Sequence, residues 1–380
     1  MTRARLAATL AVLLAPMACS AETGDRSAFQ AKDQTFVVRP LADGLEHPWA
    51  LTFLPDGALL ITERPGRLRL FADGALRAEP VGGVPAVVAR GQGGLHDVTL
   101  APDFATSRQV YLCFAGPAAG GAVTRVARGR LDDANRSLTA VSTVFETSPA
   151  LNSSKHFGCR IRFAPDGDLY LSVGERGERD QAQDLANGYG KVHRVTPDGA
   201  IPPDNPFLGT TGAQPSIFTW GHRNPQGLTV RPETDQVWLH EHGPRGGDEV
   251  NLLVAGANYG WPVVSHGNEY YGPRISSDTE APGIEPPRWV WVPSIAPSGM
   301  AFYDGDAFPA WQGDLFVGGL VQELLVRLEL DGDEVVAEER LLVETHGRIR
   351  EVEVGPDGLI YLLTDADDGR LLRLEPDPGA

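Results

Sequence analysis

The most regular feature of the chain is a unit made of an apolar segment, a short polar turn and a second apolar segment. Three close copies contain a Pro-Asp-Gly turn, and they lie at residues 51–61, 161–171 and 352–362. Three looser copies have their turns at Pro102, Pro232 and Asp304. A turn with Pro at its first central position and Gly at its end, between two β-rich segments, is typical of a β-hairpin. The pattern therefore predicts six similar hairpins.

The spacing of these hairpins predicts the fold. Successive turns begin 47 to 72 residues apart, which fits one four-stranded sheet per repeat with loops of variable length. Six such sheets in a ring form a six-bladed β-propeller, in which neighbouring sheets cover one another. A row of independent hairpin domains is the alternative, but too few residues separate the copies for separate cores. We therefore expect an all-β fold, with residues 36–380 forming a single propeller domain.

Composition supports this class and narrows the range of partners. The 380 residues include 44 Gly and 30 Pro and are 42% hydrophobic, which fits a large core interrupted by many turns. With a net charge of -17, most of the surface would repel nucleic acid or an anionic membrane. No apolar segment after the N-terminus is long enough to cross a bilayer. Monomer is the default expectation, because no self-complementary apolar segment stands out.

The N-terminus has the pattern of a secretory signal. Arg3 and Arg5 precede an apolar segment at residues 6–15, and this order is typical of signal peptides. We expect residues 1–18 to be a signal peptide and residues 19–35 to be a short linker. The mature protein is then exported, either to the periplasm or out of the cell.

The chain has three cysteines, too few for a disulfide scaffold. Cys19 follows a small residue at the end of the signal and is a candidate for lipid attachment. Pro16 and Met17 depart from the usual lipoprotein pattern, so cleavage and release is the alternative. Cys113 and Cys159 lie in apolar, strand-like segments. In an exported protein they either form a disulfide or stay as two separate buried thiols.

The candidate chemistry lies in polar loops between the predicted strands. The densest loop, Gly-His-Arg-Asn-Pro-Gln-Gly at residues 221–227, follows an apolar run that ends at Trp220. Its Arg and Asn provide a cation and an amide, which suit a small anionic ligand rich in carbonyl groups. Further polar loops lie at residues 91–94, 155–158, 242–249 and 348–350. Because propeller blades serve as a rigid frame, we expect these loops to converge at one mouth of the central channel.

Taken together, these loops resemble those of the soluble aldose sugar dehydrogenases that use pyrroloquinoline quinone (PQQ), a family with a six-bladed propeller and calcium. The resemblance runs from His-Pro-Trp at 47–49 through Asn-Tyr-Gly-Trp-Pro at 258–262 to Leu-Thr-Asp at 363–365. Five separated motifs occur in the family's order. The resemblance implies oxidation of the anomeric hydroxyl of aldoses to lactones, with PQQ and Ca²⁺ as cofactors and an unidentified electron acceptor.

The resemblance also implies roles for individual residues. His156 matches the general base, and a neutral imidazole suits removal of a hydroxyl proton as hydride leaves the carbon. Arg223 and Asn224 would contact the quinone, with Arg223 stabilising negative charge on its reactive carbonyl. The other implied cofactor-binding residues are Gln92, Tyr270, Arg348 and Arg350. Without the resemblance, Gln92 would be read as a turn cap and the two arginines as an exposed pair. Three other histidines, His96, His193 and His346, are expected to have structural roles.

Two calcium sites are implied by the same resemblance. Gly243 and Pro244 would offer backbone carbonyls to an ion that also binds the quinone, because Ca²⁺ prefers oxygen ligands. Glu249 and Tyr259 match a second site, Glu249 through its carboxylate and Tyr259 through its carbonyl. The alternative for Glu249 is an exposed acidic side chain.

Two positions depart from the glucose-oxidising members of the family. Those members have a cofactor-binding Lys after a Leu in the fifth-blade loop, whereas Val321 follows Leu320 here. They also have an Asp before the catalytic His, where this chain has Lys155. We expect weaker cofactor binding unless Arg348 and Arg350 compensate, and a sugar preference other than glucose.

Two other functions fit the same frame. A calcium-dependent hydrolase, such as a lactonase, would use an ion in the channel to activate water. Such an enzyme needs a carboxylate-rich mouth, whereas this chain offers carbonyls and arginines. A propeller that binds ligands without catalysis is the third interpretation, and Val321 is its best support.

Overall fold

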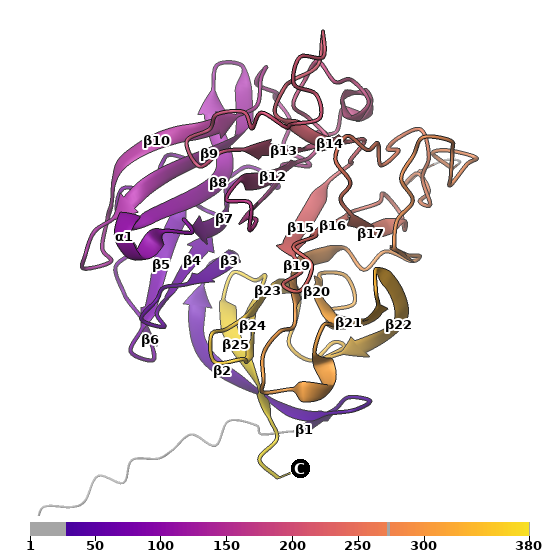
Figure 1. Cartoon of the computed structure of the whole chain (residues 1–380). Helices are drawn as coiled ribbons and strands as arrows, with labels where there is room; N and C mark the ends of the chain where they lie inside the picture. The colour runs from indigo at the N-terminus through magenta and orange to yellow at the C-terminus, as the bar shows by residue number, and fades with distance from the viewer. Residues whose placement is uncertain (1–27, 272–273, 380) are drawn as a thin grey trace, which may run out of the picture.

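The computed structural model describes residues 28–271 and 274–379, and these residues form six antiparallel β-sheets arranged in a ring (Figure 1). This arrangement confirms the predicted all-β, six-bladed propeller. Between residues 28 and 379, leaving out 272–273, helix is limited to α1, Phe104–Ser107, and to two 3₁₀ segments, Arg179–Ala182 and Pro309–Trp311. None of the described residues forms a helix long and apolar enough to span a membrane. The predicted signal peptide and Cys19 lie outside the described residues.

Each of the first five blades is built from four strands that follow one another in the chain. The first blade contains β3 (Pro48–Phe53), β4 (Leu59–Glu63), β5 (Arg67–Ala72) and β6 (Ala75–Leu76). The second contains β7 (Leu95–Leu100), β8 (Gln109–Ala118), β9 (Gly121–Leu131) and β10 (Leu138–Glu146). The third contains β11 (Gly158–Phe163), β12 (Leu169–Val173), β13 (Lys191–Val195) and β14 (Ile217–Trp220). The fourth contains β15 (Pro225–Val230), β16 (Val237–Glu241), β17 (Asp248–Leu252) and β18 (Trp289–Trp291). The fifth contains β19 (Pro297–Phe302), β20 (Leu315–Gly319), β21 (Leu324–Asp331) and β22 (Glu334–Leu341).

The sixth blade closes the ring by joining the two ends of the described chain. β23 (Ile349–Val354), β24 (Ile360–Thr364) and β25 (Gly369–Pro376) pair with β2 (Thr35–Leu45), and β1 (Ala28–Gln30) is added at the edge. The β2–β25 register runs from Phe36 opposite Pro376 to Leu45 opposite Gly369. Figure 1 shows β1 and the C-terminus side by side. Within the range expected to be linker, residues 28–30 therefore already belong to the sheet.

The six predicted hairpins are the first two strands of the six blades, from β3–β4 to β23–β24. In the three close copies the turn Asp holds the turn through its own side chain. Asp56 Oδ1, for example, accepts a hydrogen bond from Ala58 N at 3.1 Å. The following Gly57 has φ +84°, a left-handed conformation that Gly adopts at little cost. This chemistry explains why Pro-Asp-Gly recurs at equivalent places.

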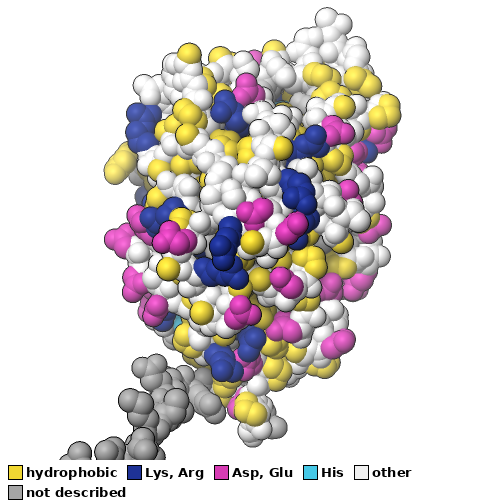
Figure 2. All heavy atoms as spheres, turned by 90° about the vertical axis from the view of Figure 1, so that its left-hand side faces the viewer, with side chains coloured by type: hydrophobic (Ala, Val, Ile, Leu, Met, Phe, Trp, Pro, Cys, Tyr) yellow, Lys and Arg dark blue, Asp and Glu magenta, His cyan; other side chains and the backbone are white. Residues whose placement is uncertain are grey.

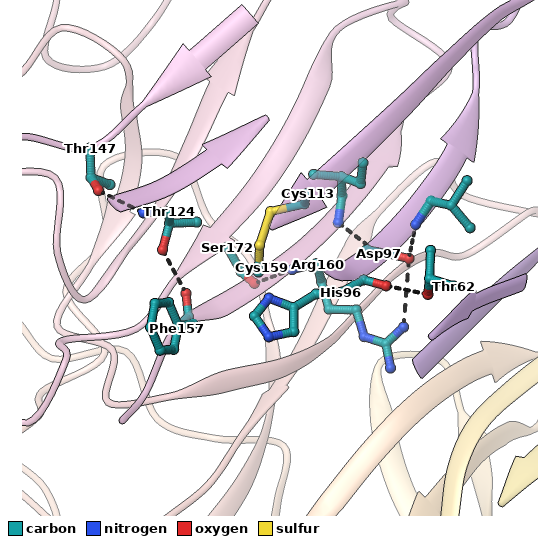
Figure 3. Close-up of a disulfide and its surroundings, with 12 residues drawn as sticks. Thr62, His96, Asp97, Cys113, Thr124, Thr147, Phe157, Cys159, Arg160 and Ser172 are labelled. Atoms are coloured by element: carbon teal, nitrogen blue, oxygen red, sulfur yellow. Dashed lines mark hydrogen bonds and ion pairs between the residues drawn. A yellow bond between two sulfur atoms is a disulfide. The ribbon is translucent and has the colours of Figure 1, made fainter. Parts of the chain in front are cut away.

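The core lies between neighbouring blades. Since each sheet is covered on both faces, its inner strands are largely buried, and all five residues of β4 and of β12 are buried. Each large aliphatic side chain buried in this way contributes about 1.5 to 3 kcal/mol. The interface between the second and third blades also carries a disulfide between Cys113 of β8 and Cys159 of β11, with the Cα atoms 5.6 Å apart (Figure 3). The structure thus joins the two cysteines whose pairing the sequence left open.

Charged side chains close the central channel. Arg160 of β11 forms an ion pair with Glu351 of β23, and these strands belong to the third and sixth blades, on opposite sides of the ring. Arg160 also lies 3.7 Å from Asp97 of β7 and donates through Nε to Gln226 O of β15 at 2.6 Å. Its guanidinium carbon stands 4.0 Å from the centre of the Trp49 ring of β3. One side chain therefore connects inner strands of five blades.

A second set of ion pairs in the channel lies beside the contacts of Arg160. Arg162 contacts Asp97 and Glu353, each at 3.3 Å. On the outside of the ring, by contrast, acidic and basic side chains are interspersed on the side that carries β5, β6 and β10 (Figure 2). The net negative charge is therefore not gathered into one patch on that side.

Replacing Arg160 tests the weight of the channel ion pair. In Arg160→Met, Glu351 and Asp97 lose their shared cation inside the protein, so we expect a loss of about 3 to 5 kcal/mol in unfolding free energy. Urea unfolding followed by tryptophan fluorescence measures the change.

Arg128→Met is the matched control. Arg128 pairs at 2.5 Å with Asp198, whose side chain is 77% exposed, and we expect a loss below about 1 kcal/mol. Equal losses in the two variants would contradict a special role for the channel pair.

Candidate active site

The loops that carry the predicted site residues open at one mouth of the ring. Loops before the innermost strand of a blade and loops after its second strand lie at the same end, because consecutive strands are antiparallel. Before the innermost strands lie Gln92, His156, Arg223, Asn224 and Arg348. After the second strand of the fourth blade lie Gly243 and Pro244. The architecture thus directs these separated residues to a common place.

His156 is held by a buried carboxylate. Its Nδ1 lies 2.9 Å from Glu175 Oε2, and the side chains of His156 and Glu175 are 12% and 2% exposed. A carboxylate accepts hydrogen bonds only, so Nδ1 carries the proton and Nε2 is left with its lone pair. Glu175 N donates to Arg223 O at 2.9 Å, which ties the two predicted residues His156 and Arg223 to the same short segment.

The environment of His156 favours its neutral form. Burial lowers the pKa of His156 below its ordinary value of 6.5, and the positive charge of Arg223 acts in the same direction. Glu175 opposes this shift without reversing it. His156 is therefore available as a proton acceptor at neutral pH.

Gln92 acts on the backbone of the His156 loop. Its Oε1 accepts a hydrogen bond from His156 N at 2.7 Å, and Gln92 N donates to Ser154 O at 2.8 Å. Gln92 O also accepts from His96 Nε2 at 2.9 Å. The structure therefore shows Gln92 as a support of His156, while the predicted contact of Gln92 with a ligand stays a prediction.

Arg223 is fixed from its backbone by a second buried carboxylate. Glu241 accepts from Arg223 N at 2.5 Å and from His222 Nδ1 at 2.7 Å. The guanidinium donates through Nη1 to the carbonyls of His242 and Gly243, at 3.1 and 2.9 Å. Arg223 Nε is buried and has no hydrogen-bond partner among the described residues. An unpaired buried donor is costly, so this atom is a candidate contact for a ligand.

Asn224 lies beside Arg223 and is 2% exposed. Its Oδ1 accepts from Gln226 Nε2 at 3.2 Å, and its backbone carbonyl accepts from His242 N at 3.1 Å. The amide therefore forms part of the wall on the fourth blade.

A third carboxylate organises the two arginines of the sixth blade. Asp365 Oδ2 lies 2.5 Å from Arg350 Nη2 and 3.5 Å from Arg348 Nη2, and Oδ1 lies 2.8 Å from His47 Nδ1. Burial would raise the pKa of Asp365, but the charge of Arg350 outweighs it and holds the pKa below 3.8. Arg350 Nε is buried without a partner among the described residues. Arg350 thus resembles Arg223 in keeping one buried donor free.

Arg348 reaches the loop where the family's lysine is missing. Its Nη1 donates to Leu320 O at 3.2 Å, and its side chain is 43% exposed. Leu320 directly precedes Val321, which is 47% exposed. A cation is therefore present near Val321 although the residue itself has none.

His242 lies among three of the predicted site residues. Burial lowers its pKa to about 3, and the charges of Arg223, Arg350 and His156 contribute. Its Nε2 donates to Pro297 O at 2.6 Å. The structure therefore brings His156, Arg223 and Arg350, from three different blades, around one half-buried histidine.

Three of the four residues implied for calcium, Gly243, Glu249 and Tyr259, line one hollow together with Arg223. The fourth, Pro244, follows Gly243 in the chain. Glu249 and Tyr259 also line a neighbouring cavity of about 370 Å³. Burial and the nearby Glu241 carboxylate raise the pKa of Glu249. No group of three or more His, Cys, Asp or Glu suited to a metal occurs within the described residues, so carbonyl oxygens are the main candidates for ion ligands here.

Tyr270 is the predicted residue that is not brought into this group. It is 58% exposed, and no hydrogen bond or aromatic contact joins it to His156, Arg223 or Arg350 among the residues that the structure describes. Its neighbour Glu269 pairs with Arg179 at 2.6 Å. Arg245 and Asn268 also exchange backbone hydrogen bonds at 3.2 and 3.3 Å, so the loop before Tyr270 contacts the predicted calcium loop.

Three important carboxylates were missed by the sequence reasoning. Each of them lies at or just after the end of the second strand of a blade. Glu175 holds His156, Glu241 holds Arg223 and Asp365 holds Arg350. A signal for them exists in the repeat. An acidic residue follows the turn residue Pro55, Pro165, Pro232 or Pro356 by eight to ten positions in four copies: Glu63, Glu175, Glu241 and Asp365.

Comparisons with known proteins decide the family. The model of the Glucose / Sorbosone dehydrogenase family matches residues 45–373. The chain belongs to the glucose/sorbosone dehydrogenase family. The family resemblance predicted from the sequence is confirmed, and this dehydrogenase is an oxidoreductase.

Several relatives match this dehydrogenase over nearly its whole length. Aldose sugar dehydrogenase YliI of Escherichia coli (strain K12) is 45% identical over 368 residues, which cover 96% of this chain and 98% of that protein. A crystal structure of a glucose dehydrogenase is 50% identical, with a TM-score of 0.87 over 89% of this chain and 99% of the other. The PQQ-bound form of an aldose sugar dehydrogenase from Streptomyces coelicolor is 32% identical, with a TM-score of 0.75 over 90% and 98% of the two chains.

The role of Asp365 can be tested through the pH dependence of stability. Asp365→Asn should lower the unfolding free energy by about 2 kcal/mol at pH 7, because charge-assisted hydrogen bonds to Arg350 and Arg348 are lost. The folded pKa of Asp365 lies below 3.8, so its stabilisation is present above that value and is lost as the pH falls through the folded pKa. The difference between wild type and variant should therefore shrink from pH 5 to pH 3. Urea midpoints across this range measure it, and a constant difference would contradict the assignment.

Proposed function

We propose that this dehydrogenase oxidises the anomeric hydroxyl of aldose sugars to the lactone, with PQQ as the oxidant and Ca²⁺ at the same site. The observation that carries the proposal is the grouping of His156, Arg223 and Arg350 around the channel mouth, each fixed by its own buried carboxylate. The E. coli relative, an aldose sugar dehydrogenase, and the PQQ-bound Streptomyces structure support the same conclusion.

The charges at the mouth fit an anionic quinone. Arg223 and Arg350 each keep a buried Nε without a partner among the described residues, and Arg348 presents a half-exposed guanidinium nearby. Planar guanidinium groups bind carboxylates with two parallel hydrogen bonds. PQQ carries carboxylates and, when bound, supplies a two-electron acceptor for the hydride of the sugar. We propose that Arg348 and Arg350 hold its carboxylates and that Arg223 and Asn224 contact its carbonyl side.

His156 acts as the general base in this proposal. Oxidation of a hemiacetal removes a hydride from carbon and a proton from the hydroxyl, and the lone pair on Nε2 accepts that proton. Glu175 keeps the imidazole in the required tautomer and stabilises the imidazolium that forms. Arg223 is placed to stabilise negative charge on a ligand oxygen. Each of these groups is already oriented by hydrogen bonds within the protein, so little reorganisation is needed during reaction.

Calcium binding at Gly243 and Pro244 is part of the proposal and requires one adjustment. Gly243 O accepts a hydrogen bond from Arg223 at 2.9 Å. If Gly243 O held a divalent ion, the Arg223 guanidinium would be repelled from that oxygen and would need another acceptor, such as an oxygen of the ligand. Binding of the ion and of the anionic cofactor should therefore favour one another. Glu249 and Tyr259 are proposed as ligands of a second ion.

We also propose that the protein is exported, as the N-terminal pattern indicates. The pairing of Cys113 with Cys159 supports this location, because structural disulfides persist in oxidising compartments. An electron acceptor of that compartment then reoxidises the cofactor.

Reconstitution tests the proposed reaction. Apo-protein supplied with PQQ and Ca²⁺ should gain dye-linked aldose oxidation, and His156→Ala should lower kcat by about 100- to 10,000-fold while it still binds PQQ. Because the pKa of His156 lies below 6.5 and the neutral form is the base, kcat/KM should stay on its plateau down through pH 6.5 and fall only below it. Kinetics over a sugar panel and a pH series measure both effects.

His346→Ala serves as a control, since the side chain of this histidine packs against Phe29 and hydrogen-bonds to Thr345, neither of which is proposed for the site, and it should keep kcat. If the reconstituted protein oxidised no aldose, the proposal would be contradicted. Lactone hydrolysis without added quinone would favour the calcium-dependent hydrolase instead.

Val321→Lys tests the missing cation. A lysine at this half-exposed position adds a positive charge beside the Arg348 guanidinium and should lower the Kd for PQQ about two- to fivefold, as expected for an exposed ion pair. Absorbance titration of the apo-protein measures it. Val321→Met has a similar chain length without charge, and equal affinity of the two variants would show that charge at this loop is irrelevant.

A further inference from the structure

We propose that the disulfide between Cys113 and Cys159 is a positioning element of the active site, which holds the His156 loop in the conformation that places His156 on Glu175. This inference rests on the proposed role of His156 as the base. It concerns the disulfide as part of the reaction machinery, in addition to its effect on stability.

The His156 loop has an unusual backbone. Within four residues, His156, Gly158 and Cys159 have φ values of 46°, 65° and 76°. Gly adopts this left-handed region freely, but for the other two residues it is unfavourable. Such a conformation persists only where the surrounding structure enforces it. The loop therefore needs external restraints to keep His156 in place.

The sheet does not supply that restraint at Cys159. In the β11–β12 ladder, Gly158 lies opposite Val173 and Ile161 lies opposite Leu171, so an extra residue is accommodated between them. This bulge removes regular strand pairing at the point where the loop joins β11. The backbone of the next residue is instead held by a side chain, because Arg160 N donates to Ser172 Oγ at 3.1 Å.

The disulfide supplies the restraint from the neighbouring blade. Cys113 lies in the middle of β8, which is paired with β7 on one side and β9 on the other. Both cysteines are 0% exposed, and they lie in the apolar cluster between the second and third blades. Figure 3 shows the sulfur bridge reaching from β8 to Cys159, three residues from His156. The least regular part of the loop is thus bonded to one of the most firmly paired strands.

Hydrogen bonds from the second blade act on the same loop. Thr124 Oγ1 of β9 donates to Phe157 O at 3.1 Å, and Gln92 Oε1 accepts from His156 N at 2.7 Å. These bonds, together with the disulfide, restrain three of four successive residues, His156, Phe157 and Cys159. The covalent bond is the restraint that survives thermal opening of the individual hydrogen bonds.

A purely stabilising disulfide would affect the folded fraction and leave the folded enzyme unchanged. A positioning disulfide changes the folded enzyme itself, since a shift of about 1 Å at a reacting group can lower a rate about 100-fold. Measurements on folded protein therefore separate the two roles.

The test compares three variants. Cys113→Ala with Cys159→Ala removes the bond and leaves a non-glycine residue at the left-handed position. Cys113→Ala with Cys159→Gly removes the bond but makes that conformation easy to adopt. Val126→Ala is the matched control, because Val126 lies opposite Cys113 in the β8–β9 ladder and in the same apolar cluster, yet its loss leaves the disulfide intact.

The first readout uses apo-protein and needs no activity. NMR titration of the imidazoles, with His156→Gln to assign the signal, reports the environment of His156, which faces Glu175, Arg223 and Lys155. In wild type its pKa should lie below 6.5. In the Ala pair the pKa should move toward 6.5, because the loosened loop lets in water and weakens burial. Val126→Ala should titrate like wild type.

The second readout is the activity of the reconstituted enzyme per folded molecule. The Ala pair should lose about 10- to 100-fold in kcat, with KM for the sugar and Kd for PQQ changed less than about threefold, since the arginines proposed to bind PQQ lie on other blades. The Gly pair should recover part of kcat relative to the Ala pair. A merely stabilising role predicts the same kcat per folded molecule in both pairs and in wild type.

Unchanged titration and unchanged kcat per folded molecule in both pairs would overturn the proposal. So would a Gly pair that is slower than the Ala pair. If the Ala pair does not fold, the Gly pair and the control still decide the question. If wild type itself oxidises no aldose, the proposed function fails, while the titration still shows whether the disulfide positions His156.

Discussion

The ion pair between Arg160 and Glu351 is the constraint on which the rest of the molecule depends. It spans the channel between the third and sixth blades, and each partner adjoins a residue of the site. Arg160 lies in β11, directly after the loop that carries His156, and Glu351 follows Arg350 in β23. Because charges buried away from water must be closely paired, the distance between these two strands has little freedom. The Arg160–Glu351 pair inside the channel therefore sets how far apart the site residues at the mouth lie, because its two buried charges must stay in contact.

The site above this layer follows one rule. Three carboxylates at or beyond the ends of second strands, Glu175, Glu241 and Asp365, each fix a group that faces the mouth. In a poorly hydrated setting such pairs are stronger than at the surface, so the imidazole and guanidinium groups are oriented before any ligand arrives. Two arginines nevertheless keep a buried nitrogen unpaired among the described residues. At this mouth, where the neighbouring groups are already oriented, each of these two nitrogens is a candidate contact for a ligand.

Sequence patterns predicted the frame well because local chemistry determines it. The three Pro-Asp-Gly turns fix their own geometry through residues such as Asp56 and Gly57, and together with the three looser copies they suffice to count the blades. The loops with His156, Arg223 and Arg348 could be found because they are dense in polar groups and resemble a known family. The carboxylate partners could not be found in this way, since a lone Glu or Asp after a strand looks like an ordinary solvated residue. Whether Cys113 and Cys159 pair was also beyond sequence reasoning, because it depends on how two adjacent blades are rotated against each other.

The closure of the ring by β2 and β25 has a consequence for biogenesis. These strands come from opposite ends of the described chain, so the sixth sheet cannot be completed until β25 has been synthesised. Until the last segment arrives, β2 and the flank of the first blade lack their partners. A prematurely terminated polypeptide would expose an unpaired strand edge, which quality-control proteases and chaperones can recognise. The propeller can therefore be completed only when β25 pairs with β2.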